Sequence, residues 1–349
     1  MVPYTRSRRG DAPRRPFPCG PASPGRSPRQ PLDASSTFAI LVSNVVTVAV
    51  AFGVAYWAFR ARHDRSAFVG LYLLFGIPGG LLLVAGLATL GGGDRRLGGL
   101  LLGIGLGFGL PLLRPVREAL GRVLPIDADS PVDMTGLCLV LGAIGFLGTP
   151  LLFPGDSLTP DELVVPTIDY VTLIAQAVSF VLIAYAAVGW KVVRGGPAAT
   201  ERLGIVPPDP RTVGFGVGAV PLGLVLAGAI NLVATTLQPG LAESLDAIVD
   251  QMTEQLQNPL GALLIGVSAG AGEEAIFRGA LQPRYGIALT SLLFALVHAP
   301  QYGLNLSILG LVALSVLLGL LRKHINTTAA MIAHALYNAV VVMLQTVAV

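Results

Sequence analysis

The sequence predicts an all-α protein, a polytopic bundle of about eight to ten transmembrane helices, and three observations support this fold class. Apolar runs long enough to cross a bilayer recur along most of the 349 residues. Only 12% of the residues are charged, against roughly 25% in soluble domains. The runs do not alternate between apolar and polar residues, so helices rather than barrel strands are expected to satisfy the backbone in lipid.

The chain begins with a segment unlike the rest. Residues 1–35 are rich in arginine, proline, serine and glycine. This composition cannot bury a core, so we predict a disordered tail, with an over-long gene model as the alternative.

Ten apolar runs follow the tail and are the expected spans. In order, they are residues 38–59, 66–90, 97–113, 134–153, 168–190, 213–237, 259–282, 286–300, 304–321 and 328–348. A span needs about 20 residues, so the eighth run is short enough to be tilted or partly re-entrant. Residues 238–258 differ from the other loops, because leucine, valine and methionine recur there at helical spacing with acids between them. This pattern predicts an amphipathic helix on the membrane surface.

Loop charge predicts the orientation of the spans. Arginine and lysine follow the odd-numbered spans, whereas the loops around 156–162 and 238–258 are acidic. By the positive-inside rule, residues 191–212 face the cytoplasm and residues 238–258 face outside. The tail, with seven arginines in its first 30 residues, then lies outside. Either it is not part of the protein, or the span count is off by one near the start. The net charge of +3 is small, so we expect a multi-pass protein of the cell membrane that binds no nucleic acid.

Chemically reactive side chains gather in the last 90 residues. Within apolar sequence there lie Glu273, Glu274, Arg278, His298, His334 and Asn338. An aspartate, lysine or arginine at the centre of a span costs about 2.5–3.5 kcal/mol on the insertion scale. A layer of six such groups therefore predicts a functional site, and interhelical packing contacts are the less favoured alternative.

Spacing assigns these residues to helix faces. Glu274 and Arg278 are four residues apart and can form an ion pair on one face. Glu273 points about 100° away, which leaves its carboxylate free. His334 and Asn338 are also four apart, so the imidazole and the amide share a face. Counted along each helix from one membrane face, all these groups fall in one layer.

Three motifs in this region resemble those of a known family. Residues 273–278 read Glu-Glu-Ala-Ile-Phe-Arg, residues 294–298 read Phe-Ala-Leu-Val-His, and residues 334–338 read His-Ala-Leu-Tyr-Asn. In this order they resemble the E-E-x-x-x-R, F-x-x-x-H and H-x-x-x-N/D motifs of the CAAX-protease and bacteriocin-processing membrane proteases, also called CPBP or Abi. The resemblance covers about residues 259–345.

The resemblance implies an intramembrane endopeptidase that cleaves a membrane-associated protein or peptide; a prenylated substrate is the family prototype, and other substrates stay open. Glu273 and His298 would activate a water molecule, and His334 and Asn338 would stabilise the oxyanion, with Glu274 and Arg278 in support. The chain would comprise N-terminal transmembrane helices, residues 36–212, and a protease core, residues 213–349, with the active site in the last four helices.

Two further questions stay open at the level of sequence. Glu273, His298 and His334 form a two-histidine, one-carboxylate set of the kind that ligates Zn²⁺, but a metal-independent glutamate mechanism is also compatible with them and is slightly favoured. A non-enzymatic membrane scaffold, immunity factor or transporter using the same polar layer is the alternative function. Gly266-Val267-Ser268-Ala269-Gly270 fits the G-x-S-x-G pattern of hydrolases, but inside an apolar helix we interpret it as a packing surface.

Overall fold

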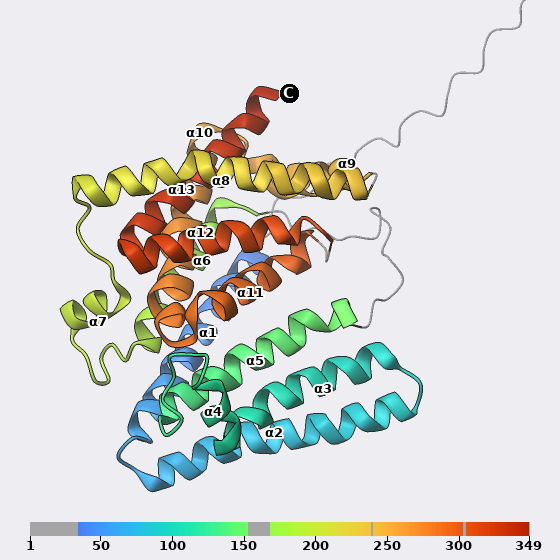
Figure 1. Ribbon diagram of the computed structural model, residues 1–349, viewed down its shortest axis with the longest axis vertical. Coiled ribbons are helices and arrows are strands. Elements are labelled where there is room, and N and C mark those ends of the chain that lie inside the picture. The colour runs from blue at the N-terminus through green and yellow to red at the C-terminus, as the bar shows by residue number, and fades with distance from the viewer. Residues whose placement is uncertain (1–33, 153–167, 239, 303–304, 349) are drawn as a thin grey trace, which may run out of the picture.

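The computed structural model describes residues 34–152, 168–238, 240–302 and 305–348 (Figure 1). Within these ranges the regular elements are helices, so the predicted all-α polytopic bundle is confirmed. The predicted disordered tail falls almost entirely outside the described residues, as does the acidic segment 156–162.

The first half of the chain forms two long helices, a bent pair and further helices that lead to the core. Its elements are α1 (Ala34–Arg60), α2 (Arg65–Gly91), α3 (Arg95–Gly109), η1 (Leu110–Leu112), α4 (Arg114–Leu120), α5 (Pro131–Leu152), α6 (Tyr170–Ala187) and α7 (Gly196–Leu203).

The second half contains the polar layer. Its elements are α8 (Pro210–Leu237), α9 (Leu241–Thr253), η2 (Glu254–Leu256), α10 (Pro259–Val267), the π-helical segments η3 (Ser268–Glu273) and η4 (Ala275–Leu281), α11 (Gln282–Tyr302), α12 (Ile308–His324) and α13 (Thr327–Ala348).

Every expected span coincides with a helix, but fewer of these helices are long enough to cross a bilayer alone. In the described part of the chain, seven helices are long and apolar enough, or eight if the bent pair around Leu113 is counted as one span. The seventh and eighth expected spans form one stretch, Pro259–Pro300. The boundary expected between them coincides with a backbone break at Gly286, where the φ of 72° is readily adopted by glycine.

Small residues hold the first helices together. A Cβ at Gly107 would lie 2.4 Å from the backbone nitrogen of Gly142, and one at Gly103 would lie 2.8 Å from the carbonyl oxygen of Gly145. Only glycine allows α3 and α5 to approach this closely.

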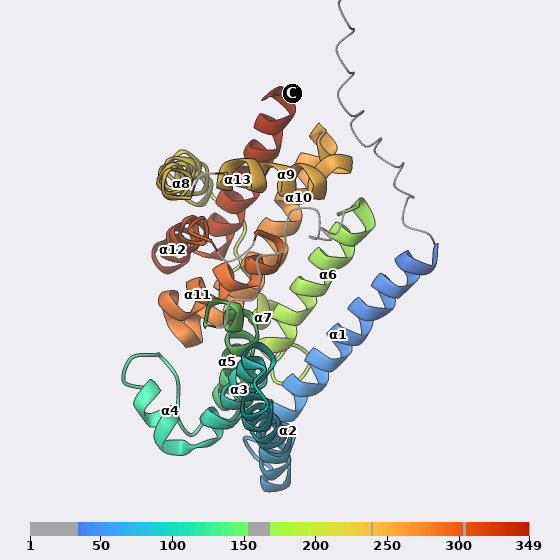
Figure 2. The same ribbon diagram turned by 90° about the vertical axis from the view of Figure 1, so that its right-hand side faces the viewer.

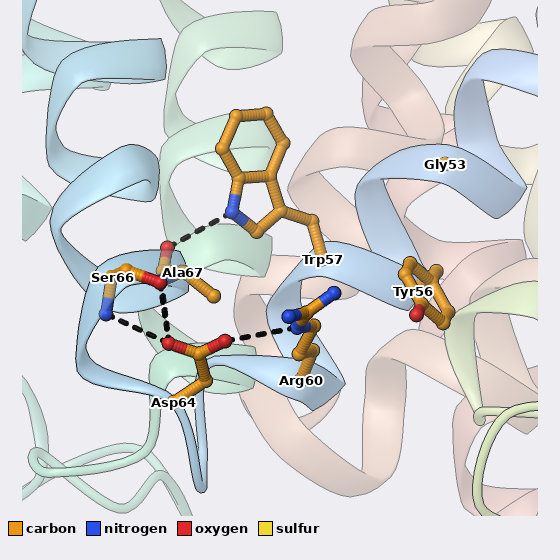
Figure 3. Close-up of a pocket in the computed structure, with 7 residues that line it drawn as sticks. All are labelled: Gly53, Tyr56, Trp57, Arg60, Asp64, Ser66 and Ala67. Carbon is orange, nitrogen blue, oxygen red and sulfur yellow. Dashed lines mark hydrogen bonds and ion pairs between the residues drawn. The ribbon is translucent and has the colours of Figure 1, made fainter.

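The turn between α1 and α2 is fixed by a capping aspartate (Figure 3). The Asp64 carboxylate accepts from the Ser66 and Ala67 backbone N–H groups, at 2.8 and 3.3 Å, and pairs with Arg60 at 3.0 Å. Hydrogen bonds from the Ser66 hydroxyl, the Ala67 N–H and Arg60 lower the pKa of Asp64 to about 2. Trp57 donates to the carbonyl of Ala67 at 2.9 Å and lines a pocket of about 420 Å³ beside this turn.

In the second half, α13 lies between α8 and α12 on one side and α10 on the other (Figure 2). Helix α9 bears out the predicted amphipathic helix, since Met252 is buried while Glu243 and Asp250 are exposed, and Leu256 of the following η2 is buried as well. Helices α7 and α9 lie at opposite ends of the bundle (Figure 1). This arrangement agrees with the opposite membrane sides predicted for residues 191–212 and 238–258.

Candidate active site

Close contact of α10 and the π-helical segment η3 with helix α13 brings the polar residues together. A Cβ at Gly266 would lie 2.4 Å from the carbonyl oxygen of Ala335, and one at Gly270 would lie 2.6 Å from that of Met331. Between these glycines, the Ser268 hydroxyl donates to the carbonyl of Leu173 at 3.1 Å. The G-x-S-x-G run is therefore a packing surface, as predicted, and its serine is engaged with the backbone of α6.

The centre of the site is a buried chain of three side chains. Arg278 Nε donates to Glu274 Oε2 at 2.9 Å, and neither side chain is exposed to solvent. The other oxygen of Glu274 lies 2.9 Å from His334 Nδ1. The predicted ion pair between Glu274 and Arg278 is thus confirmed, and it extends to a histidine 60 residues away. Since a carboxylate only accepts hydrogen bonds, His334 carries its proton on Nδ1.

Arg278 also contacts two further helices. Its Nη2 donates to the Ser315 hydroxyl on α12 at 3.0 Å. Its guanidinium lies 5.2 Å from the ring centroid of Phe294 on α11, within the range of a cation–π interaction. These contacts hold Arg278 in place and, through the ion pair, the carboxylate of Glu274. A buried charge needs such pairing and hydrogen bonding to be stable.

The second glutamate has a different environment. Glu273 Oε2 lies 3.9 Å from His298 Nε2, and the two side chains are 15% and 19% exposed. Among the described residues, this oxygen has no hydrogen-bond partner although it is buried. His298 Nδ1 lies 2.7 Å from the carbonyl oxygen of Phe294, which requires the proton on Nδ1. The lone pair of Nε2 is then on the side of Glu273.

Phe294 packs between the two histidines. Its ring centroid lies 4.7 Å from that of His298 and 5.8 Å from that of His334. Phe277 contacts its edge at 5.1 Å. The aromatic ring therefore separates the Glu273–His298 pair from the Glu274–His334 pair while holding both imidazoles in place. The motif contained this residue, but spacing alone did not identify its role.

Asn338 lies one turn beyond His334 on α13 and is half-buried. The expected shared face of His334 and Asn338 follows from their positions in one continuous α-helix. Sequence reasoning missed Ser315 altogether. The only signal for it was a small polar residue in the apolar run of α12, which is common in membrane helices and has no specific meaning by itself.

The expected zinc ligands are not gathered around one point. In the described part of the chain, no three histidine, cysteine, aspartate or glutamate side chains are placed so that they could hold a metal ion. The geometry gives a reason, because His334 Nδ1 is bonded to Glu274 whereas His298 Nε2 is near Glu273. The residues present do not fit a three-ligand site in this arrangement.

Comparison with known proteins tests the resemblance. No curated protein and no solved structure matches the chain. A family model, described as type II CAAX prenyl endopeptidase Rce1-like, matches residues 255–340. The matched segment contains all six residues of the polar layer, and it agrees with the resemblance to the CPBP proteases. Residues 255–340 are therefore similar to the Rce1-like type II CAAX prenyl endopeptidases, and they lie in a chain whose described part has seven helices long and apolar enough to cross a membrane.

Proposed function

We propose that this protein is an intramembrane endopeptidase of the cell membrane that hydrolyses a peptide bond in a membrane-associated, prenylated CAAX-type substrate. The nucleophile is a water molecule activated by Glu273 and His298. The cut bond lies within the polar layer of the C-terminal helices.

The single observation that carries the proposal is the contrast between the two adjacent glutamates. Glu274 has both oxygens engaged, at 2.9 Å each, by Arg278 and His334. Glu273 Oε2 has no partner among the described residues and lies 3.9 Å from His298 Nε2. A water molecule at hydrogen-bond distance from both atoms fits this separation. A general base must lie within such reach of the proton that it removes.

The reaction follows from these positions. Water donates a proton to the Glu273 carboxylate while its oxygen attacks the substrate carbonyl carbon, and His298 orients the water through Nε2. The negative charge then develops on the carbonyl oxygen and needs hydrogen-bond donors. The Asn338 amide is one donor. His334 is the other when its ring carries a proton on Nε2 as well as on Nδ1, a charged form that the buried Glu274 carboxylate stabilises.

The breakdown of the tetrahedral intermediate reverses the flow of protons. The proton held by Glu273 passes to the leaving amine, the C–N bond breaks, and two peptides are released with the carboxylate of Glu273 restored. Glu274 and Arg278 take no part in this transfer and serve to position His334.

Turnover in proteoliposomes tests the proposal. The purified protein is given a fluorogenic peptide with a farnesylated cysteine three residues before its C-terminus. We expect cleavage by the wild type, loss of cleavage in Glu273→Gln, and unchanged cleavage in His324→Gln, which alters an exposed histidine outside the site. Cleavage by Glu273→Gln at the wild-type rate would rule out the mechanism.

A further inference from the structure

Arg202 and Arg322, with Arg194 and Arg284 nearby, form an arginine cluster. The cluster lies where α7, η4, α12 and α13 meet, at the end of the bundle expected to face the cytoplasm. The end of α7 is fixed there by two bonds from α13: the N–H of Thr327 donates to the Gly204 carbonyl at 3.0 Å, and its hydroxyl donates to the Leu203 carbonyl. Leu203 also packs against η4, where a Cβ at Gly279 would lie 2.9 Å from its side chain. The cluster is therefore built on the same segment that carries the candidate active site.

Arg322 links the cluster to that segment. Its Nε donates to the backbone carbonyl of Arg278 at 3.3 Å. Its guanidinium covers Gly204, where a Cβ would lie 2.5 Å from Cζ. Gly204 has a φ of 68°, so glycine is required there for its backbone as well as for the space. This geometry holds a planar guanidinium at the edge of the site, next to Arg202 on the last turn of α7.

The cluster has more positive than negative charge. Burial, followed by the nearby guanidiniums of Arg284, Arg194 and Arg322, lowers the pKa of Arg202. The nearby acid is Asp133, and it forms an ion pair with Arg284. Within the described residues, neither Arg202 nor Arg322 forms an ion pair with a carboxylate. Half-buried cations without a counter-charge are costly and favour the binding of an anion.

The distance from the proposed base selects the anion. Arg278, whose carbonyl Arg322 contacts, is five residues after Glu273, which is at most about 7.5 Å along a helix. Three residues of extended chain span about 10 Å. A peptide cut at Glu273 three residues before its end would thus carry its terminal carboxylate to the cluster. We propose that Arg202 and Arg322 bind the C-terminal carboxylate of the substrate, an inference that rests on the proposed function.

The physical reasons for such a site are geometric and electrostatic. A free carboxylate is costly inside the bilayer, so a substrate whose cut bond lies below the surface needs cations for its charged end. Guanidinium groups match a carboxylate with two parallel hydrogen bonds, which an amide at the same position does not replace. Arg202 and Arg322 would thus act as a carboxylate clamp at a fixed distance from the cut bond. The clamp would disfavour substrates whose chain continues beyond it.

The test compares two farnesylated peptides that differ only at the C-terminus, one a free acid and the other an amide. We expect the wild type to cleave the acid with a KM about 10- to 100-fold below that of the amide, the range for one or two charged hydrogen bonds. Arg202→Gln and Arg322→Gln should raise the KM of the acid towards that of the amide and leave the amide unchanged. Lys323→Gln, an exposed change at the same end of α12, is the matched control.

Three results would overturn the clamp. The first is an equal KM for both peptides in the wild type. The second is an equal rise of KM for both peptides in the arginine variants. The third is an acid preference equal to that of the wild type in a variant that combines Arg202→Gln with Arg322→Gln. The cluster would instead bind a phospholipid headgroup if two results were found together. The acid preference would appear only in the absence of anionic lipid, and the arginine variants would lose binding to anionic lipid. Arg202 makes no hydrogen bond to a described residue, so Arg202→Gln keeps the test valid should Arg322→Gln fail to fold.

A binding measurement separates this inference from the proposed function. Fluorescence anisotropy of the two peptides with the Glu273→Gln protein measures acid preference without turnover. If the wild type cleaves neither peptide, the proposed function fails, whereas equal affinity of both peptides for Glu273→Gln refutes the clamp alone.

Discussion

Substituting each of the two adjacent glutamates by glutamine should damage the protein in different ways. Glu273→Gln keeps the shape of the side chain but removes its ability to accept a proton. Because Glu273 Oε2 has no hydrogen-bond partner in the described structure, the change breaks no hydrogen bond of this oxygen. We expect the protein to stay folded and turnover to fall by about 10²–10⁴-fold, the usual effect of losing a general base. This corresponds to about 3–5 kcal/mol in the reaction barrier.

Glu274→Gln should act on stability. The amide oxygen can still accept from His334 Nδ1, but Arg278 loses the counter-charge that it contacts at 2.9 Å, and neither side chain is exposed. Removal of one member of a buried ion pair typically costs about 3–5 kcal/mol. Arg278 keeps its bond to Ser315, but a neutral hydroxyl does not replace a carboxylate. Glu274→Gln combined with Arg278→Met should recover part of the lost stability, because it removes the stranded charge.

The two energies are similar, so the assay must measure turnover and unfolding separately. Thermal midpoints and initial rates are measured in the same detergent for the wild type, Glu273→Gln, Glu274→Gln and the double variant. Glu201→Gln, on the exposed surface of α7, is the control for loss of a carboxylate. The assignment is wrong if Glu273→Gln retains near-normal turnover. It is equally wrong if Glu273→Gln unfolds while Glu274→Gln is folded and inactive.

Three further predictions concern topology, metal and packing. Without Cys19, a cysteine at exposed position 201 should be labelled only from the cytoplasm and one at 243 only from outside; labelling of both from one side would reject the orientation. Because Glu273, His298 and His334 do not converge on one point, turnover should survive a strong chelator; a loss of turnover that added Zn²⁺ restores would show a zinc requirement instead. Gly270→Leu should separate η3 from α13 and reduce both turnover and stability, while Gly214→Leu, where a Cβ meets nothing within 4 Å, should have little effect; equal losses in both would contradict the packing argument.

The sequence predicted the helices because lipid leaves the backbone few alternatives. It also predicted the ion pair between Glu274 and Arg278, since four-residue spacing is a local property of a helix. The count of independent spans was less predictable. Whether Pro259–Pro300 behaves as one stretch or two depends on the backbone at Gly286, and glycine is compatible with both a helix and a break.

Contacts between distant segments were beyond local reasoning. The bond from His334 to Glu274 depends on the register of α13 against α10 and η3. Close backbone approaches at Gly266 on α10 and Gly270 on η3 set this register. Sequence reasoning placed His334 beside Asn338 and could not identify a partner 60 residues away. For the same reason it combined Glu273, His298 and His334 in one hypothetical metal site, although Phe294 packs against both rings and the two imidazoles face different glutamates.

The π-helical segments explain how neighbouring glutamates can serve different helices. Glu273 ends η3 and Ala275 begins η4, so the pair lies where one π-helical segment meets the next. Such segments are rare, and they are frequently found at functional sites. Here the two segments give an arrangement in which Glu274 reaches His334 on α13 while Glu273 reaches towards His298 on α11. One short segment thereby separates the group proposed to accept a proton from the group that positions the opposite histidine.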